Sequence, residues 1–211
     1  MEPFSTVTGA AAPLMLDNVN TDQIIPSAFL KDMTADLSQG LLAYMRRTTD
    51  GARNLDFVLE KPQYNQAPIL VVGRNFGCGS SREHAVWALR AFGIRCVIGP
   101  SHAEFFRENC LRNGVLPITL DEQQMGALVQ HVEKVDGQAP FTVDLQSCEI
   151  RGPRGYACRF DISPSERTAM LEGLDDIGLT LQHMDAIAAW EARIASERPF
   201  MQASIARLHV P

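Results

Sequence analysis

The chain has 211 residues, of which 45% are hydrophobic and 21% charged, the usage of an ordinary globular protein with a buried core. Its formal net charge is −6 and its lysines and arginines form no block, which disfavours a nucleic-acid surface with its usual basic stripe. No apolar run approaches the roughly 18 residues that span a bilayer. The N-terminus also lacks the basic and apolar segments of a secretion signal. We therefore expect a cytoplasmic protein that binds neither nucleic acid nor membrane.

The cysteines are scattered along the chain. No two of them form a C-x-x-C pair, and their spacing fits neither a zinc site nor an iron–sulfur cluster. An odd number of cysteines without a secretion signal indicates reduced thiols, as in a cytoplasm. The sequence thus predicts no metal site in this chain, so any metal chemistry would belong to a partner. The five positions are Cys78, Cys96, Cys110, Cys148 and Cys158.

Strand and helix patterns alternate in the middle of the chain. Short apolar runs rich in β-branched residues predict buried strands at 68–73, 94–99 and 115–120. Amphipathic patterns predict helices after each strand, at 81–92, 101–113 and 121–135. This alternation is typical of an α/β fold in which neighbouring strands are parallel.

Each of these helices is predicted to begin with a capping box. In this arrangement the cap side chain and the side chain three residues later each bond the other's backbone N–H group. The third pair is a looser version with an aspartate cap. The pairs are Ser80 with Glu83, Ser101 with Glu104, and Asp121 with Gln124.

The flanking segments have other patterns. A β-hairpin is predicted from strands at 141–150 and 156–162 around a glycine and proline turn. A short helix should follow, with Ser163 as its cap and Pro164 at its first position. Residues 182–198 show the periodicity of an amphipathic helix, and the polar segment 31–55 is predicted to be long and mobile. We expect a single domain over residues 1–198 and a surface-bound or loose tail over residues 199–211.

The stretch "GCGSSREH" at residues 77–84 allows two interpretations. In the simpler one, Ser80 caps a helix and the glycines form a tight turn. In the other, the free N–H groups of Gly79, Ser80 and Ser81 hold an anion, and Arg82 grips its carboxylate with two hydrogen bonds. A cation in a first helical turn opposes the helix dipole, and a bound anion would reverse that penalty. A serine hydroxyl in such a positive field can remove a weakly acidic C–H proton.

Other chemistries fit the same stretch less well. A P-loop would need a lysine, and a dinucleotide-binding motif would need a third glycine where Arg82 stands. Cys78 could act as a nucleophile near a helix N-terminus, but no aspartate or asparagine obviously completes a triad. His84 could be a base, although a histidine on an amphipathic helix more often donates a structural hydrogen bond.

The tract "NFGCGSSREHAVWAL" resembles the signature of the swivelling domain of the aconitase superfamily, whose hallmark is G-S-S-R-E. The chain is more closely similar to the small subunits of bacterial 3-isopropylmalate dehydratase (isopropylmalate isomerase), and this similarity runs nearly end to end. Several blocks in the right order are more specific than one glycine loop. The further blocks are "NVNTDQIIPSAFL" (18–30), "FVLEKPQY" (57–64), "NGVLPITL" (113–120) and "GLDDIGLTLQHMDAIAAWE" (173–191).

The resemblance implies an α/β fold with a three-layer β/β/α swivelling domain, which would contain the βαβαβα unit of residues 68–135. It also implies a heterodimer with a large subunit that carries a [4Fe–4S] cluster, whose unligated iron acts as a Lewis acid on the substrate. The reaction would be dehydration of 2-isopropylmalate to isopropylmaleate and rehydration to 3-isopropylmalate, a step of leucine biosynthesis.

The resemblance further implies a role for each residue of the tract. Ser80 would be the base that takes the C–H proton and returns it. Ser81 and Arg82, beside Gly79, would hold a substrate carboxylate. The segment after Pro26 aligns with the loop that sets substrate choice, and its residues are Phe29, Leu30 and Lys31. Lys31 could favour a third carboxylate or could simply be solvated.

Alternatives to this assignment remain open. Family members that act on methylmalate, dimethylmalate or homoaconitate-type acids share the same tract, so the substrate is not fixed. The turn at 77–82 could also belong to a non-catalytic anion-binding module, or Cys78 to a stand-alone thiol enzyme. The polar block at 17–22 lacks the spacing of a calcium loop and suggests Asx turns instead, with Asn20 where the family usually has aspartate.

Overall fold

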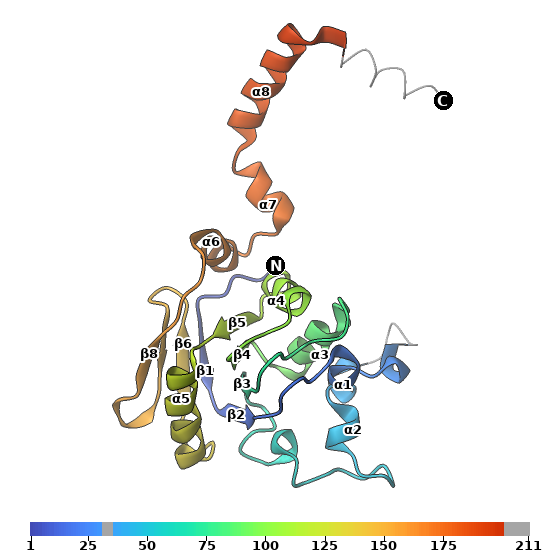
Figure 1. Ribbon diagram of the computed structural model, residues 1–211, viewed down its shortest axis with the longest axis vertical. Helices are drawn as coiled ribbons and strands as arrows, with labels where there is room; N and C mark the ends of the chain where they lie inside the picture. The colour runs from blue at the N-terminus through green and yellow to red at the C-terminus, as the bar shows by residue number, and fades with distance from the viewer. Residues whose placement is uncertain (31–35, 201–211) are drawn as a thin grey trace. The chain divides into compact units, whose positions relative to one another are not determined.

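The structure is a computed structural model that describes residues 1–30 and 36–200 (Figure 1). Its contacts divide the chain into two compact units, Met1–Gly173 and Leu174–Pro211. The larger unit contains both sheets and the whole predicted alternation of strands and helices. No change of composition in the sequence marks the boundary between the two units.

A four-stranded parallel sheet forms the middle layer of the larger unit. Its order is that of the chain: β2 (Ala11–Leu14), β3 (Ile69–Val72), β4 (Cys96–Gly99) and β5 (Leu116–Thr119). The strands predicted at 68–73, 94–99 and 115–120 are confirmed, as is their parallel pairing. Strand β2 was not predicted, because its sequence "AAPL" contains no β-branched residue.

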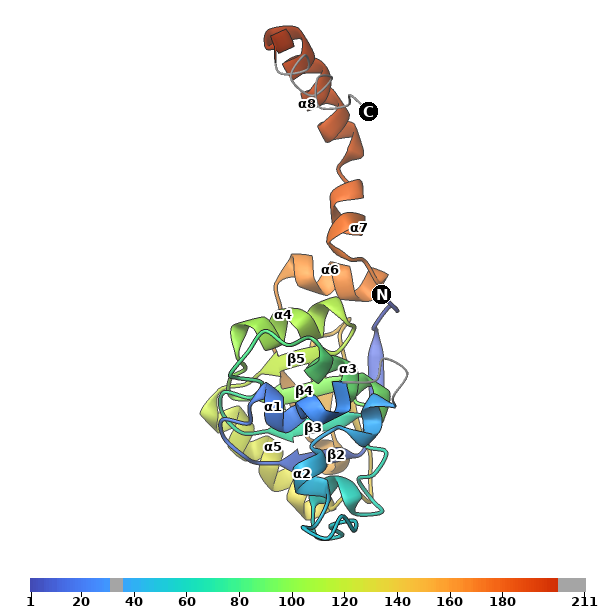
Figure 2. The same cartoon turned by 90° about the vertical axis from the view of Figure 1, so that its right-hand side faces the viewer.

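Each face of the parallel sheet packs against a different layer, because successive side chains of a strand point to opposite faces. Leu70 and Val72 of β3 belong to one apolar cluster with the helices α3 (His84–Phe92) and α4 (Glu104–Arg112). Ile69 and Val71 belong to a second cluster with the other sheet and α5 (Glu122–Val135). Figure 2 shows the helices α1 to α4 in front of the parallel sheet.

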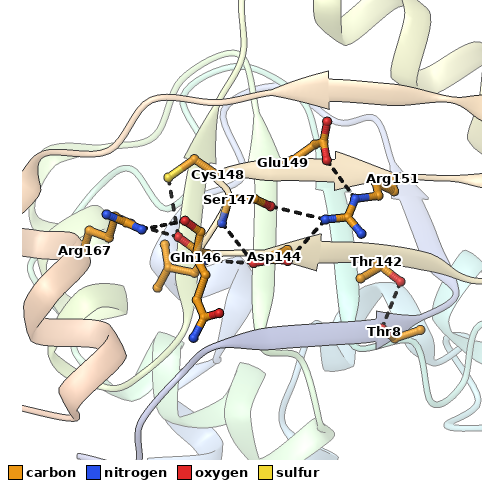
Figure 3. A network of polar contacts seen from close by, with 10 residues as sticks. Thr8, Thr142, Asp144, Gln146, Ser147, Cys148, Glu149, Arg151 and Arg167 are labelled. Carbon is orange, nitrogen blue, oxygen red and sulfur yellow. Dashed lines mark hydrogen bonds and ion pairs between the residues drawn. The ribbon is translucent and has the colours of Figure 1, made fainter.

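The outer layer is an antiparallel sheet, which completes the predicted three-layer β/β/α fold. The single strand predicted over 141–150 is wrong, because a turn after Asp144 divides this segment into the strands β6 and β7. In this turn Asp144 accepts hydrogen bonds from the N–H groups of Gln146 and Ser147 at 2.8 and 3.1 Å (Figure 3). The predicted hairpin around the glycine and proline turn joins β7 and β8 through η4 (Pro153–Gly155). The order of the sheet is β1 (Thr6–Gly9), β6 (Phe141–Asp144), β7 (Glu149–Arg151) and β8 (Ala157–Arg159).

Helix α6 (Pro164–Glu172) fastens this turn to the rest of the unit. Ser163 caps the helix in a capping box and Pro164 is its first residue, as predicted. Arg167 donates hydrogen bonds to the carbonyl groups of Leu145 and Gln146 at 3.1 and 2.5 Å (Figure 3). The turn between β6 and β7 is therefore held by the side chain of a helix that follows it in the chain.

Two of the predicted capping boxes are wrong. Helix α3 begins at His84, and its cap position, Glu83, makes no side-chain cap bond. The cap position of α4 is Ala103 and not Ser101. The hydroxyl of Ser101 accepts a hydrogen bond from the N–H group of Asn75 at 2.8 Å. The capping box of Asp121 and Gln124 at the start of α5 is confirmed.

A short part of the segment predicted to be mobile is built into the core. After residues 31–35, which lie outside the described residues, Leu41, Leu42 and Ala43 are buried against the first apolar cluster and its neighbours. The prediction of mobility is therefore wrong for this stretch. The short elements that surround the parallel sheet on this side are α1 (Thr21–Ile24), η1 (Ser27–Leu30), η2 (Leu37–Gln39), α2 (Ala43–Arg46) and η3 (Val58–Glu60).

The smaller unit is helical in its described part. It contains α7 (Asp176–Leu181), capped by Asp175, and α8 (Met184–Glu197), which confirms the helix predicted over 182–198. Of the predicted tail, only Pro199 and Phe200 are described. No helix in the described ranges 1–30 and 36–200 combines the length and the apolar character needed to cross a membrane.

A neutral histidine supports the edge of the parallel sheet where the loops after β3 and β4 meet. His102 forms an isolated β-bridge with Phe76, and its ring stacks on Phe106 at a centroid distance of 6.2 Å. Its Nε2 atom is buried without a hydrogen-bond partner among the described residues, and its Nδ1 atom lies 3.5 Å from the Thr119 hydroxyl. Burial lowers the pKa of His102 to about 4, and the positive charge of Arg107 acts in the same direction.

We predict that protonation of His102 weakens the fold in mild acid. Because its pKa is lower in the folded chain than the ordinary 6.5, its contribution to stability is complete above pH 6.5 and is lost as the pH falls toward 4. The loss should reach up to about 3 kcal/mol. Urea unfolding at several values of pH should show this decline, and His102→Phe, which keeps the ring contact with Phe106, should flatten it. An equal decline in the variant would assign the acid sensitivity to other groups.

Candidate active site

The stretch at 77–84 lies beside the loop that follows β2, at the carboxyl end of the parallel sheet, where open α/β sheets commonly bind ligands. The N–H group of Gly77 donates to the carbonyl of Val19 at 2.7 Å, and the N–H group of Thr21 donates to the carbonyl of Cys78 at 2.9 Å. Asn20 and Cys78 form an isolated parallel bridge. The two blocks "NVNTD" and "GCGSSRE" are thus paired backbone to backbone.

The glycines of the turn are required by geometry. Gly77 has φ +79°, and a Cβ atom there would overlap the ring of Phe106. Gly79 has φ +97°, a conformation that residues with side chains rarely adopt. Phe106 packs edge-on against Phe76 with ring centroids 5.4 Å apart, so the floor under the turn is rigid.

Ser80 is exposed at the tip of this turn. Its hydroxyl oxygen lies 2.6 Å from that of the buried Thr21, in a hydrogen bond that either group could donate. The N–H group of Arg82 also donates to the Ser80 hydroxyl, at 3.4 Å. Within residues 1–30 and 36–200, the backbone N–H groups of Gly79, Ser80 and Ser81 have no hydrogen-bond acceptor. The site therefore combines a hydroxyl with unsatisfied donors, as the anion-binding interpretation of the sequence requires.

Arg82 makes an ion pair that the sequence did not indicate. Its Nη1 atom is 2.5 Å from a carboxylate oxygen of Asp22 and donates to the carbonyl of Ile25 at 3.1 Å. Because α3 begins at His84, Arg82 precedes the first turn, and the expected conflict with the helix dipole is not present. In the free chain, Asp22 supplies the negative charge that the sequence pattern led us to expect from a ligand.

Helix α4 supports the tract from behind through two asparagine side chains. Asn109 donates to the carbonyl of Ser81 at 3.1 Å, and Asn113 donates to the carboxylate of Glu83 at 2.7 Å. One turn separates the two asparagines, so they lie on the same face of α4. Sequence reasoning missed both, and the four-residue spacing of two amides on an otherwise mixed helix is the only signal that could have indicated them.

His84 does not take part in this set of contacts. Its ring packs against Trp87 at a centroid distance of 4.5 Å, and no hydrogen bond joins it to Ser80 in the described part of the chain. The indole N–H group of Trp87 in turn donates to Asn113 at 3.1 Å. These contacts favour a structural role for His84 over a role as base.

The polar side chains of the first block fix the neighbouring loops. Asp17 accepts a hydrogen bond from the N–H group of Arg74 at 2.7 Å, and Asn18 accepts one from the side chain of Asn75 at 2.9 Å. Asn20 caps α1 in a capping box with Gln23. These side chains thus serve as caps and ties between loops, and Asn20 keeps the capping function that an aspartate would have at this position.

Two of the predicted specificity residues, Phe29 and Leu30, lie in η1. This element begins two residues after Ile25, whose carbonyl accepts a hydrogen bond from Arg82. Phe29 lines a hollow of about 410 Å³ together with Ala43, Tyr44 and Arg47. Leu30 is half-buried against the first apolar cluster, and Lys31 lies outside the described residues. The structure thus places the start of the predicted loop near the site, on the side of Arg82 that faces Ile25.

The described thiols do not form a ligand set. Among these residues, no group of three or more histidine, cysteine, aspartate or glutamate side chains converges to hold a metal ion. Burial raises the pKa of Cys96 and of Cys110, which disfavours the thiolate forms that ligate iron. Cys78 is half-buried, and its thiol donates to the carbonyl of Asn18 at 3.5 Å.

Comparisons with known proteins assign this chain to a family. The aconitase C-terminal domain family matches residues 1–123, and the family of C-terminal domains of 3-isopropylmalate dehydratase small subunits matches residues 176–204. A 3-isopropylmalate dehydratase small subunit of Mesorhizobium japonicum is 51% identical over 201 residues, which cover 95% of this chain and 100% of the relative. The corresponding small subunit of Paramagnetospirillum magneticum is 50% identical over 202 residues, with coverages of 95% and 100%.

A solved structure has the same fold. The crystal structure of 3-isopropylmalate dehydratase from Methanocaldococcus jannaschii matches with a TM-score of 0.61 and 25% sequence identity, and it covers 88% of this chain and 99% of that one. The range matched by the aconitase C-terminal domain family, residues 1–123, includes both loops of the site. The chain therefore belongs to the family of 3-isopropylmalate dehydratase small subunits within the aconitase superfamily.

Proposed function

We propose that this chain is the small subunit of a hydro-lyase that converts 2-isopropylmalate into 3-isopropylmalate through isopropylmaleate, a step of leucine biosynthesis. The family supports this reaction. The observation that carries the proposal is the exposed Ser80 hydroxyl, which lies 2.6 Å from Thr21 and next to Arg82 and three free backbone donors. No other described part of the chain joins a proton-transfer group to a site for a carboxylate in this way.

Ser80 would move the proton of the reaction. In the dehydration step the Ser80 oxygen takes a proton from the carbon adjacent to the hydroxyl-bearing carbon. The hydroxyl leaves from the hydroxyl-bearing carbon as the double bond forms between the two. In the rehydration step, the hydroxyl of water adds to the carbon that lost the proton. Ser80 returns the proton to the carbon that originally carried the hydroxyl. A hydrogen bond from the Thr21 hydroxyl would stabilise the deprotonated Ser80 oxygen, because charged acceptors form the stronger hydrogen bonds.

The neighbouring donors would orient the substrate. The N–H groups of Gly79, Ser80 and Ser81 are free to bind one carboxylate, and the guanidinium of Arg82 lies on the same loop. Phe29 and Leu30 of η1, with Lys31, would line the part of the site that distinguishes the isopropyl group from other substituents. A methylmalate or homoaconitate-type substrate would need different side chains at these positions. Comparing the turnover of these acids with that of isopropylmalate therefore tests the substrate assignment.

The remaining part of the site would come from a large subunit in a heterodimer. The family name of the relatives implies such a partner. We infer that the partner holds the [4Fe–4S] cluster, because the scattered and partly buried thiols described here do not suit one. When bound, the cluster would supply the Lewis acid for the leaving hydroxyl. A cytoplasmic location suits the unpaired thiols, and we propose it on that ground.

We predict that Ser80→Ala abolishes turnover in the complex with the large subunit. Loss of the proton-transfer group should lower kcat by about two to four orders of magnitude. Because Ser80 does not cap α3, the variant should lose only its hydrogen bond to Thr21 and the long one from the N–H group of Arg82, about 1–2 kcal/mol of stability. The assay is isopropylmaleate formation by the reconstituted enzyme, with methylmalate and homocitrate as alternative substrates. Ser196→Ala on the exposed face of α8 is the matched control, and near-normal activity of Ser80→Ala would exclude the proposed base.

We predict that lysine cannot replace Arg82. A guanidinium grips a carboxylate with two parallel hydrogen bonds, whereas an ammonium is a single point charge. Arg82→Lys and Arg82→Ala should each lower kcat/KM by roughly 30- to 1000-fold, the equivalent of about 2–4 kcal/mol. Both should cost about 1–2 kcal/mol of stability, because the pair with Asp22 is partly solvent-accessible and the hydrogen bond to the carbonyl of Ile25 is weakened or lost. Kinetics with the large subunit and melting temperatures measure the two effects; a lysine variant of nearly full activity would contradict the two-pronged grip.

We predict that the isolated chain takes up no iron–sulfur cluster. Anaerobic incubation with iron and sulfide should leave the purified chain colourless, whereas the complex with the large subunit should become brown. The physical reason is that thiolates are the usual cluster ligands and the described thiols do not converge. A stoichiometric chromophore on the isolated chain would move the cluster from the partner to this subunit.

A further inference from the structure

A second cationic site lies on the 36–60 side of the larger unit. It is a hollow of about 310 Å³, here called the arginine hollow, with a mainly polar lining. Three of its five lining residues are arginines and only one is acidic, although the chain as a whole carries a net charge of −6. The lining residues are Gln39, Arg46, Arg47, Arg53 and Glu60.

Glu60 forms the floor of the arginine hollow. Its carboxylate is 2% exposed and accepts from the Nε atoms of Arg46 and Arg53 at 2.6 and 2.5 Å. Burial raises the pKa of Glu60, but the hydrogen bonds and charges of the two arginines outweigh this effect and hold the pKa below its ordinary value. Glu60 is therefore ionised, and it neutralises one of the three guanidinium groups.

Arg46 is the structural member of this cluster. It is 14% exposed, donates through Nη1 to the carbonyls of Ser38 and Leu41, and lies 4.9 Å from the ring centre of Phe92. All of these contacts tie the segment to the core. Arg46 and Glu60 can thus be regarded as a neutral pair, which leaves the charges of Arg47 and Arg53 to be explained.

Arg47 and Arg53 face each other directly across a short hairpin. They form an isolated antiparallel bridge, and directly opposed residues of such a pair have neighbouring side chains. Like charges in this position are destabilising unless something compensates them. Arg53 reaches Glu60, but the guanidinium of Arg47 has two long contacts within residues 1–30 and 36–200, to the carbonyl of Gly51 at 3.4 Å and to the side-chain oxygen of Gln39 at 3.5 Å.

The acidic residues near this hairpin do not supply the compensation. Asp50 at the hairpin tip accepts from the Thr48 hydroxyl and from the N–H group of Ala52. Asp36 accepts from the N–H group of Ser38 at 2.9 Å and lies 3.5 Å from the amide nitrogen of Gln39. Among the described residues no carboxylate pairs with Arg47, which lines the hollow with its two long contacts to neutral groups.

We propose that the arginine hollow binds a small oxyanion of the phosphate or carboxylate type between Arg47 and Arg53. Two guanidinium groups offer paired donors that match the oxygens of such an ion, and this geometry is specific to arginine. The bound ion would neutralise the opposed charges of the hairpin. It would also connect the hairpin with Gln39, next to Gly40, whose backbone lies against Phe29 of the predicted specificity loop.

This site is separate in composition from the one at Ser80, and it does not depend on the proposed function. None of its lining residues belongs to the tract at 77–84 or to the first block. The proposed reaction could therefore be correct without this site, and the reverse also holds. A small anion in the hollow would act as a brace of the segment 37–53 rather than as a substrate.

Isothermal titration of the full chain with inorganic phosphate, and separately with malonate, tests the proposal against chloride at equal ionic strength. We expect a saturable site whose affinity falls in Arg47→Gln, and no heat of this kind with chloride. A response to phosphate alone or to malonate alone would identify which oxyanion the hollow takes. Absence of saturable binding by both ions would overturn the proposal.

Variants locate the bound ion. Arg47→Gln should weaken binding at least tenfold, and Arg53→Gln, which leaves the Arg46–Glu60 pair intact, should have a similar effect. Arg151→Gln, an equally exposed arginine of β7, is the matched control and should bind normally. Arg82→Ala should also bind normally. Binding that survives Arg47→Gln but is lost in Arg82→Ala would place the ion at the Ser80 turn and refute the site; circular dichroism verifies that each variant is folded.

Discussion

The close approach of the chain to Phe106 at Gly77 is the constraint on which the site depends. A side chain at Gly77 would overlap the ring of Phe106, so only glycine allows the backbone to pass this close to the ring. The crossing brings the strand-like segment after β3 against the loop after β2, where Gly77 and Thr21 exchange backbone hydrogen bonds with Val19 and Cys78. Ser80 is then carried to within 2.6 Å of Thr21, although 59 residues separate them in sequence. The position of the hydroxyl is thus decided by packing under the turn rather than by the residues beside it.

The ion pair of Arg82 with Asp22 shows how the free chain stays stable without its proposed substrate. A partly exposed pair of this kind contributes about 1 kcal/mol or less, because water screens the exposed carboxylate of Asp22. A substrate carboxylate held by the guanidinium and by the free N–H groups in a closed site would contribute several times more. In the proposed complex, the exchange of Asp22 for a substrate would therefore be favourable, and the carbonyl of Ile25 holds the guanidinium in place in the free chain. Because that carbonyl leads into η1, the residue that would bind the substrate charge is directly connected to Phe29 and Leu30.

The sequence predicted those parts of the fold that depend on local pattern. β-branched runs located three strands of the parallel sheet, whereas the alanine-rich β2 has no such signal and is a strand only because Ile69–Val72 pairs with it. The tract at 77–84 could be identified from its residues. The spacing of Ser80 and Glu83, in contrast, could not show that the predicted capping box is not formed. Each side chain bonds a distant partner, Thr21 and Asn113, in place of the other. The strand predicted over 141–150 failed for a related reason, since an aspartate inside an apolar alternation can reverse the chain by accepting two backbone hydrogen bonds.

In the proposed reaction, exposure to water would be the main obstacle to Ser80 acting as a base. Ser80 is exposed, and in bulk water the donors around it compete with solvent for every negative charge. The same hydrogen bonds strengthen severalfold once the surroundings have a low dielectric constant, so a deprotonated serine becomes accessible only when something covers the turn. The described residues over the turn are themselves polar or exposed, since Asp22 and Gln23 lie on the open side of α1. In the proposed complex, the partner would therefore contribute more than a cluster. By excluding water from the Ser80 turn, it would convert donors that are already in position into donors strong enough to hold the charge of the reaction.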